Sequence, residues 1–258
     1  MEDLAHTDIP LAVDWVCRET GFDSIDIVAH CMGAAMLSMA ILGCENKDWP
    51  IPDCDYVDRL PDARQQLPNR IRRVVMTQVG PVVIPTPLNR MRGYLARFLL
   101  RRRPNVGYEF RPGTTPSLPE QLLDRVFAAQ GYSRREMKRE NPFSWRRVEH
   151  VGTRRRIDGL FSKTFELNEV ADDTLRHIDD LFGPTNLATI AQATHFARWF
   201  TITRRDGRNY FLDRGRLQKH WKIPTLYMHG AKNGMMDVAN SQRMTKLFTD
   251  SGMGQWLQ

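Results

Sequence analysis

The sequence predicts an α/β fold, an α/β-hydrolase-like parallel sheet that is flanked by helices and interrupted by an inserted helical cap. Three apolar segments, residues 25–28, 72–79 and 223–228, have the length and composition of buried strands. The first strand runs directly into an apolar helix, Ala34–Leu42, and helical segments separate the others. Strands that alternate with helices pair in parallel, so we expect one parallel sheet.

The elements around these strands follow from local signals. Residues 9–20 carry an amphipathic pattern that ends at Gly21, which predicts a helix with a glycine cap. Residues 44–69 are rich in Asp and Pro and predict a long surface loop. The segment Ile223–Gly230 predicts a strand that ends in a glycine turn, and Asn240–Phe248 predicts the helix after it.

The pattern divides the chain into three parts. Residues 1–84 form a partial sheet core, residues 85–222 an arginine-rich and mostly helical insertion, and residues 223–258 the return of the core. We expect an incomplete sheet, because few residues precede the first strand and few follow the last. The helices expected in the insertion are Leu88–Arg101, Leu118–Gln130, Asp172–Phe182 and Leu187–Phe200.

Composition indicates a soluble globular protein. The 258 residues are 41% hydrophobic and 26% charged, which excludes disordered and collagen-like classes. No apolar stretch reaches the roughly 20 residues needed to span a bilayer, and we expect a cytoplasmic location. No Cys-x-x-Cys pair occurs and no histidine has metal-ligand spacing, so we expect no metal site and four reduced thiols: Cys17, Cys31, Cys44 and Cys54.

Positive charge is concentrated in the insertion. Residues 90–160 hold 17 Lys and Arg against 7 Asp and Glu, while the whole chain has a net charge of +7. Such a surface could contact nucleic acid, an anionic membrane surface or an acidic partner. Because no nucleic-acid motif or aromatic stacking pair accompanies the arginines, we expect no nucleic-acid partner and favour a solvated or partner-facing surface. Peripheral membrane contact through this basic cap stays open.

The turn at Cys31 is the main candidate site. The run from Ala29 to Gly33 joins a strand to a buried helix, and this is the setting of a nucleophile elbow, in which Cys31 takes the usual serine position. The flanking Ala29 and Gly33 are small enough for close backbone passage. We expect the following helix to lower the pKa of the thiol, and the backbone N–H of Met32 to form half of an oxyanion hole.

A structural interpretation competes with this one. Cys31 would then be a small buried residue at a strand–helix junction, as most free cysteines are. We expect His30 and His229 to be supporting residues near the elbow rather than proton carriers. The histidines of the insertion, His150, His177, His195 and His220, are expected to be structural.

Several segments together resemble a known family. The chain is similar over nearly its whole length to the α/β-hydrolase domain associated with cholesterol-oxidase-like flavoproteins of the glucose-methanol-choline oxidoreductase family. The resemblance rests on residues 26–34, 39–40, 77–79, 86–90, 141–142, 156–157, 160–161, 181–186 and 223–233.

This resemblance implies an ester or thioester hydrolase or acyltransferase for lipid or steroid-like substrates, with Cys31 as nucleophile. It places the acid at or near Asn233, with Asp237 as the fallback. The base would be a histidine after one further strand, yet no histidine follows His229. The chain therefore resembles an internal fragment, for which we expect low activity. No Gly-x-Gly-x-x-Gly motif is present, so FAD is expected only on a separate oxidoreductase domain that would be the partner.

Two other functions remain open at this stage. The first is a non-catalytic binding or partner module that keeps the hydrolase scaffold, which Asn233 and the missing histidine favour. The second and weaker one is a nucleic-acid binder acting through the basic insertion.

Overall fold

The computed structural model describes residues 1–49, 57–100, 107–111, 150–161 and 169–258. These residues form two compact units. Unit 1 comprises Met1–Thr86 and Gln192–Gln258, and unit 2 comprises Pro87–Ala191. The helix expected at Leu118–Gln130 lies outside the described residues.

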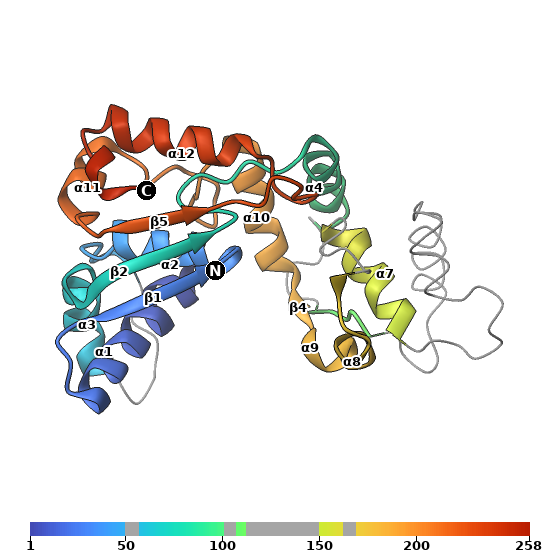
Figure 1. Ribbon diagram of the computed structural model, residues 1–258, viewed down its shortest axis with the longest axis horizontal. Helices are drawn as coiled ribbons and strands as arrows, with labels where there is room; N and C mark the ends of the chain where they lie inside the picture. The colour runs from blue at the N-terminus through green and yellow to red at the C-terminus, as the bar shows by residue number, and fades with distance from the viewer. Residues whose placement is uncertain (50–56, 101–106, 112–149, 162–168) are drawn as a thin grey trace. The chain divides into compact units, whose positions relative to one another are not determined.

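Unit 1 is built on a three-stranded parallel sheet in the order β1-β2-β5 (Figure 1). The strands are β1 (Ile25–His30), β2 (Ile71–Thr77) and β5 (Thr225–Met228). Their register aligns His30 with Thr77 and Thr77 with Met228, so all three strands end in one row. The predicted mixed α/β fold with a parallel sheet is confirmed at this level.

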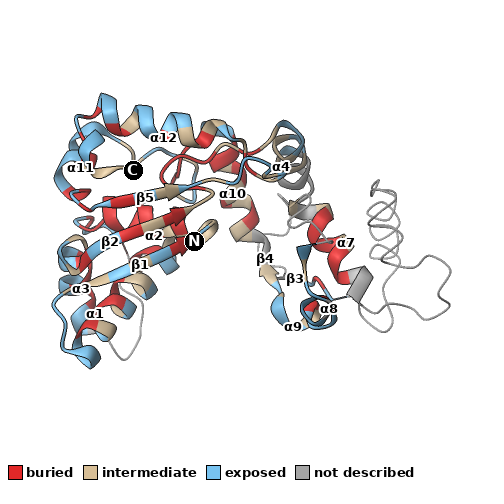
Figure 2. Cartoon of the chain, in the orientation of Figure 1, coloured by how far each residue is buried: buried red, intermediate tan, exposed pale blue. Residues whose placement is uncertain are grey.

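The first helix and strand follow the sequence pattern closely. Helix α1 (Ile9–Thr20) ends at Gly21, whose φ of 71° is the left-handed cap conformation that glycine adopts without strain. A short π-helical segment, Leu4–Asp8, precedes α1. Helix α2 (Met32–Leu42) follows β1 directly and is mostly buried, as Figure 2 shows. Its apolar residues therefore supply much of the core against the sheet.

The long loop predicted for residues 44–69 is wrong over its second half. Residues 57–70 form a 3-10 turn (Val57–Arg59), helix α3 (Leu60–Gln66) and a second 3-10 turn (Leu67–Arg70). Leu60, Ala63 and Leu67 are all buried, each at most 2% exposed. Their spacing puts one apolar face inward, and its burial overrides the Asp and Pro signals that favoured a loop.

The sheet unit closes with β5 and its flanking helices. Helix α11 (Arg214–His220) precedes β5, and α12 (Ala239–Asp250) follows it, ahead of a last 3-10 turn (Gly254–Trp256). The main chain then returns beside β5: the N–H of Tyr227 donates to the carbonyl of Gln258 at 2.9 Å, and the N–H of Gln258 donates to Thr225. Residues 257–258 thus extend the sheet beyond β5.

One face of the sheet is open in the described structure. The alternating residues of the strands place Val28, Val75 and Leu226 in one row across this face. Val28 is 77% exposed and Leu226 43% exposed. The opposite face carries the buried Ala29, Val74 and Met76. Parallel sheets are normally covered on both faces. The exposed apolar side chains of this face are therefore available for packing against another surface.

Unit 2 is mostly helical. It contains α4 (Pro87–Leu100), α7 (His150–Phe161), α8 (Asp172–Arg176), α9 (Ile178–Leu181) and the two-stranded antiparallel pair β3 (Gly107–Tyr108) and β4 (Thr185–Asn186). A small apolar cluster of Phe110, Ile157 and Ile178 forms its core. The single helix expected at Asp172–Phe182 is interrupted at His177, whose φ of −99° and ψ of 13° leave the helical region.

The insertion is shorter than expected. Helix α10 (Leu187–Trp199) begins in unit 2, but its second half and residues 200–222 belong to the sheet unit. The reason is packing, because Phe196, Phe211 and Trp221 are fully buried in the main core. The predicted boundary at 222 is therefore replaced by one near 191. No described helix is long and apolar enough to cross a membrane.

Candidate functional site

The backbone at Cys31 has the conformation of a sharp strand-to-helix turn. Cys31 is the N-cap of α2, and its φ of 50° and ψ of −121° lie outside the regions that L-residues normally occupy. Such a conformation costs on the order of 1–3 kcal/mol and persists only where the surroundings enforce it. Two backbone hydrogen bonds hold Cys31 in this conformation: its N–H donates to the Thr77 carbonyl at 3.0 Å, and its carbonyl accepts from the Ala34 N–H at 2.9 Å.

The start of α2 points hydrogen-bond donors at the turn. The first helical N–H groups with a carbonyl partner are those of Ala34 and Ala35, both bonded to Cys31. Met32 and Gly33 precede them and belong to the helix end where N–H groups lack intrahelical partners. The backbone of Met32, the next residue, lowers the pKa of the Cys31 thiol. The N–H groups of Met32 and Gly33 are those from which an oxyanion donor at Cys31 would be drawn.

The expected lowering of the Cys31 pKa is wrong. Burial raises the pKa of this thiol, because a thiolate loses water contacts there, and the hydrogen bond from Met32 offsets only part of the effect. Cys31 is partly exposed at its surface, so it is reachable from solvent but resides in an apolar environment. The thiol is therefore neutral near pH 7 and needs a proton acceptor before it can attack.

Ala29 and Gly33, two positions before and after Cys31, have different surroundings. Ala29 is buried in the sheet at 7% exposure, as expected for a residue facing α2. A Cβ added at Gly33 would meet no atom within 4 Å. The expected close backbone passage at Gly33 is thus absent, and an alanine fits there without a clash.

His30 ends β1 and His229 follows β5, the strands on either side of β2. Nδ1 of His30 lies 2.5 Å from Oγ1 of Thr77 and the residue is exposed on the open face. Nδ1 of His229 lies 3.0 Å from the carbonyl oxygen of Gln78, which also accepts from the Tyr227 hydroxyl at 2.8 Å. Burial raises the pKa of Tyr227, so this hydroxyl stays a donor. Sequence reasoning gave Gln78 no role.

The two acid candidates are engaged in turns. Oδ1 of Asn233 accepts the N–H groups of Met235 and Met236 at 2.9 and 3.0 Å. Oδ1 of Asp237 accepts the N–H of Ala239, the first residue of α12, at 2.9 Å. The structure shows neither side chain bonded to a histidine, and both have a local structural role.

A thiol–imidazole contact lies just beyond the other end of α2. The sulfur of Cys44 is 3.4 Å from Nδ1 of His220, and Nε2 of His220 is 3.5 Å from Oε2 of Glu45. Lys219 binds the same carboxylate at 2.7 Å. Burial raises the pKa of Cys44 to about 11 and lowers the pKa of His220. Because Cys44 is only 5% exposed, this cluster links the end of α2 to α11 and does not present a nucleophile to solvent. Cys44 and His220 are 176 residues apart, so no sequence pattern predicted their contact.

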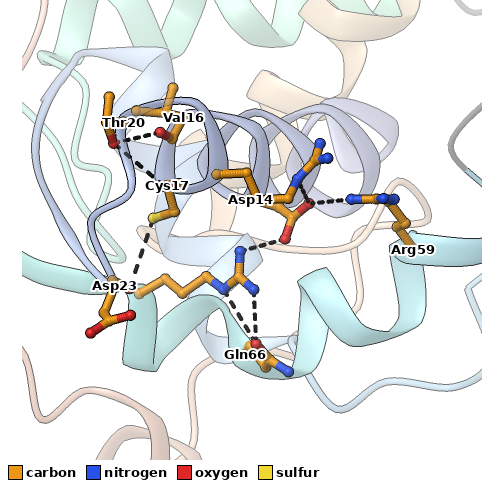
Figure 3. Close-up of polar contacts among 9 residues, drawn as sticks. Asp14, Val16, Cys17, Thr20, Asp23, Arg59 and Gln66 are labelled. Atoms are coloured by element: carbon orange, nitrogen blue, oxygen red, sulfur yellow. Dashed lines mark hydrogen bonds and ion pairs between the residues drawn. The ribbon is translucent and has the colours of Figure 1, made fainter.

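A charged cluster stabilises α1 on its neighbours. Asp14, 7% exposed, accepts from Arg18 at 3.1 Å and from Arg70, which also binds Gln66 (Figure 3). Arg59 approaches the same carboxylate at 4.0 Å. A cavity of about 220 Å³ lies beside the cluster, lined by Leu11, Ala12, Asp14, Trp15, Arg18 and Arg59. Cys31 is not among its lining residues, so we assign this cluster to packing.

Other possible sites are few among the described residues. No group of three His, Cys, Asp or Glu side chains in this part of the chain is placed to hold a metal ion. The described cysteines, Cys17, Cys31 and Cys44, are free thiols. Comparison with protein-family models finds no matching family, and no curated protein matches the sequence. The functional argument therefore rests on the residues themselves.

Proposed function

We propose that the chain is an α/β-hydrolase-like domain in which Cys31 accepts an acyl group from an ester or thioester. The observation that carries this proposal is the backbone of Cys31, with φ 50° and ψ −121°, at the junction of a parallel strand and a buried helix. A non-glycine residue strained at that junction is typical of a nucleophile elbow. Reactive residues are presented there with helix N–H groups beside them.

The chemistry follows from these groups. After losing its proton, the Cys31 sulfur adds to the carbonyl carbon of the substrate, and the N–H of Met32 would donate to the developing oxyanion. The alcohol or thiol leaves with a proton, and a thioester remains on Cys31. Water then hydrolyses the thioester, or a second alcohol accepts the acyl group.

The resemblance to the domain associated with cholesterol-oxidase-like flavoproteins supports lipid or steroid-like esters as the substrate class. A flavoprotein oxidoreductase domain is then the expected partner, and that domain rather than this chain would bind FAD. Peripheral membrane contact through the basic insertion would bring the domain to such substrates.

The test is ester turnover by the chain and by two alanine variants. Wild-type protein should hydrolyse p-nitrophenyl esters, with longer acyl chains favoured over acetate. Cys31→Ala should reduce the rate to the uncatalysed level, whereas Cys17→Ala, which removes a buried thiol of 6% exposure, should retain it. Equal rates for wild type and Cys31→Ala would refute the proposal.

One observation favours a second function, a non-catalytic partner module. The open sheet face carries Val28, Leu226 and Met228, which are 77%, 43% and 51% exposed. A row of exposed apolar side chains on a parallel sheet is a surface that a partner could cover. Absent turnover together with concentration-dependent association that Val28→Lys abolishes would support this function instead.

A further inference from the structure

The central strand carries an unusual residue just beyond its end. Gln78 follows β2 with a φ of 73°, which is rare for a residue other than glycine. Its N–H donates to the Met228 carbonyl at 2.8 Å, so it remains tied to β5. Its own carbonyl accepts from both Tyr227 and His229. A left-handed residue thus supplies the oxygen that orients the His229 ring.

This hydrogen bond fixes the tautomer of the neutral imidazole. A carbonyl oxygen only accepts, so Nδ1 of His229 must carry the hydrogen, and the lone pair is then on Nε2. Nε2 is buried and has no hydrogen-bond partner among the residues that the structure describes. A buried nitrogen without a partner is destabilising, because it has lost its hydrogen bonds to water without replacing them. Nε2 of His229 is therefore a buried proton acceptor with no donor among the described residues.

The strand register puts the residues Cys31 and His229 at the same edge of the sheet, two strands apart. Cys31, Gln78 and His229 each come one residue after the aligned row of His30, Thr77 and Met228. Two strand spacings of about 4.8 Å separate Cys31 from His229, so their Cα atoms are roughly 10 Å apart. The His229 ring reaches the central strand, since it bonds Gln78. With their Cα atoms roughly 10 Å apart, the Cys31 thiol and the His229 imidazole can exchange a proton through one water, as catalytic pairs without substrate often do.

We propose that His229 is the general base that takes the proton of Cys31. This inference rests on the proposed acyl transfer at Cys31. The S–H bond of Cys31 breaks as an N–H bond forms at Nε2 of His229, and the thiolate attacks the substrate carbonyl. The imidazolium then returns that proton to the leaving alkoxide, so the histidine ends neutral. The Gln78 carbonyl holds the ring, a role that a carboxylate fills in Ser-His-Asp enzymes.

The test separates the two functions of the imidazole. His229→Asn keeps an N–H donor near the Nδ1 position for Gln78 and removes the acceptor at Nε2. His30→Asn is the matched control, because it makes the same change at the end of β1, on the other side of the central strand β2. The readouts are the rate of Cys31 alkylation by iodoacetamide at pH 7.5, measured by peptide mapping, and the acylation rate with p-nitrophenyl acetate. Thermal unfolding confirms that each variant is folded.

His229→Asn should slow alkylation at least about tenfold and acylation about 100-fold, while His30→Asn should leave both within about twofold. Added imidazole should partly restore acylation in His229→Ala. Unchanged alkylation in folded His229→Asn would overturn this inference even if Cys31 is acylated. Alkylation that depends on His229 without any acylation would instead contradict the proposed acyl transfer, so the two failures are distinguishable.

Discussion

The sulfur of Cys44 lies 3.4 Å from Nδ1 of His220, a buried contact just beyond the C-terminal end of helix α2. At the other end, α2 begins at Cys31, whose backbone is strained. Cys44 is enclosed and bonded, whereas Cys31 is partly exposed beside helix N–H groups. The two cysteines flank one helix but differ in access. This difference predicts which thiol reacts.

Native-state labelling should therefore be selective. Among the three cysteines that the structure describes, a thiol reagent such as iodoacetamide at pH 8 should modify Cys31 first, because Cys17 and Cys44 are only 6% and 5% exposed and react after local opening. Peptide mapping at increasing times gives the order. Modification of Cys17 or Cys44 ahead of Cys31 would show that Cys31 is less accessible than the fold indicates.

Alkaline pH should weaken the fold through Cys44. Its folded pKa is raised from 9.0 to about 11, so folding keeps a proton that the unfolded chain has already lost. The stabilisation is complete below pH 9 and is lost as the pH rises through 11. Urea unfolding between pH 8.5 and 10.5 should show a decline that is smaller in Cys44→Ala. An identical decline in both proteins would exclude this thiol as a cause.

Acid should destabilise the protein through His6. This histidine is 3% exposed and stacked on Trp49, and burial lowers its pKa from 6.5 to about 2. Below pH 6.5 His6 is protonated in the unfolded chain and neutral in the folded chain. The free energy of unfolding therefore falls with decreasing pH, by up to about 1.4 kcal/mol per pH unit. His6→Leu should reduce this slope between pH 6.5 and 4.5. An unchanged slope in His6→Leu would exclude His6 as the cause of the acid sensitivity.

The two faces of the sheet should respond differently to the same substitution. Val74 is 1% exposed and Val28 is 77% exposed. Val74→Ala should cost about 2 kcal/mol or more of unfolding free energy, because it leaves a cavity in the core. Val28→Ala should cost less than about 0.5 kcal/mol. Comparable losses for the two variants would show that the open face is covered in solution.

The strain at Cys31 can be measured by comparing glycine with alanine. Both Cys31→Gly and Cys31→Ala remove the thiol, but only glycine accepts a φ of 50° without strain. Cys31→Gly should therefore be more stable than Cys31→Ala by about 1 kcal/mol in urea unfolding. At Ala35, inside α2, glycine should instead be the less stable residue by about 1 kcal/mol. A glycine penalty at both positions would rule out the strained turn.

Local patterns were sufficient to predict much of the sheet unit. Helix α1 spans the predicted Ile9–Thr20, since its amphipathic pattern and the Gly21 cap are both encoded within a few residues. The apolar segment before Cys31 and the helix after it likewise specify the turn. The helix at Leu60–Gln66 was missed because Pro and Asp near its start favour loops, whereas tertiary burial of Leu60 and Leu67 determines the outcome.

The candidate site was only partly predictable for a related reason. The position of Cys31 follows from neighbours in the sequence, but its raised pKa depends on burial by distant segments. The bond between Gln78 and His229 joins residues 151 apart, and no local pattern in the sequence predicts that contact. Asn233 and Asp237 lie in the region expected for the acid, yet each side chain accepts a hydrogen bond from a backbone N–H two residues later. The sequence alone did not predict these bonds.

The most direct test of the account is to trap the acyl group itself. The protein would be incubated with an activated octanoyl ester, quenched in acid and analysed by peptide mapping with mass spectrometry. The account predicts an octanoyl thioester on Cys31, removed by hydroxylamine and absent from Cys31→Ala. An unmodified Cys31 peptide after ester consumption, or octanoylation spread over lysines and other cysteines, would contradict it.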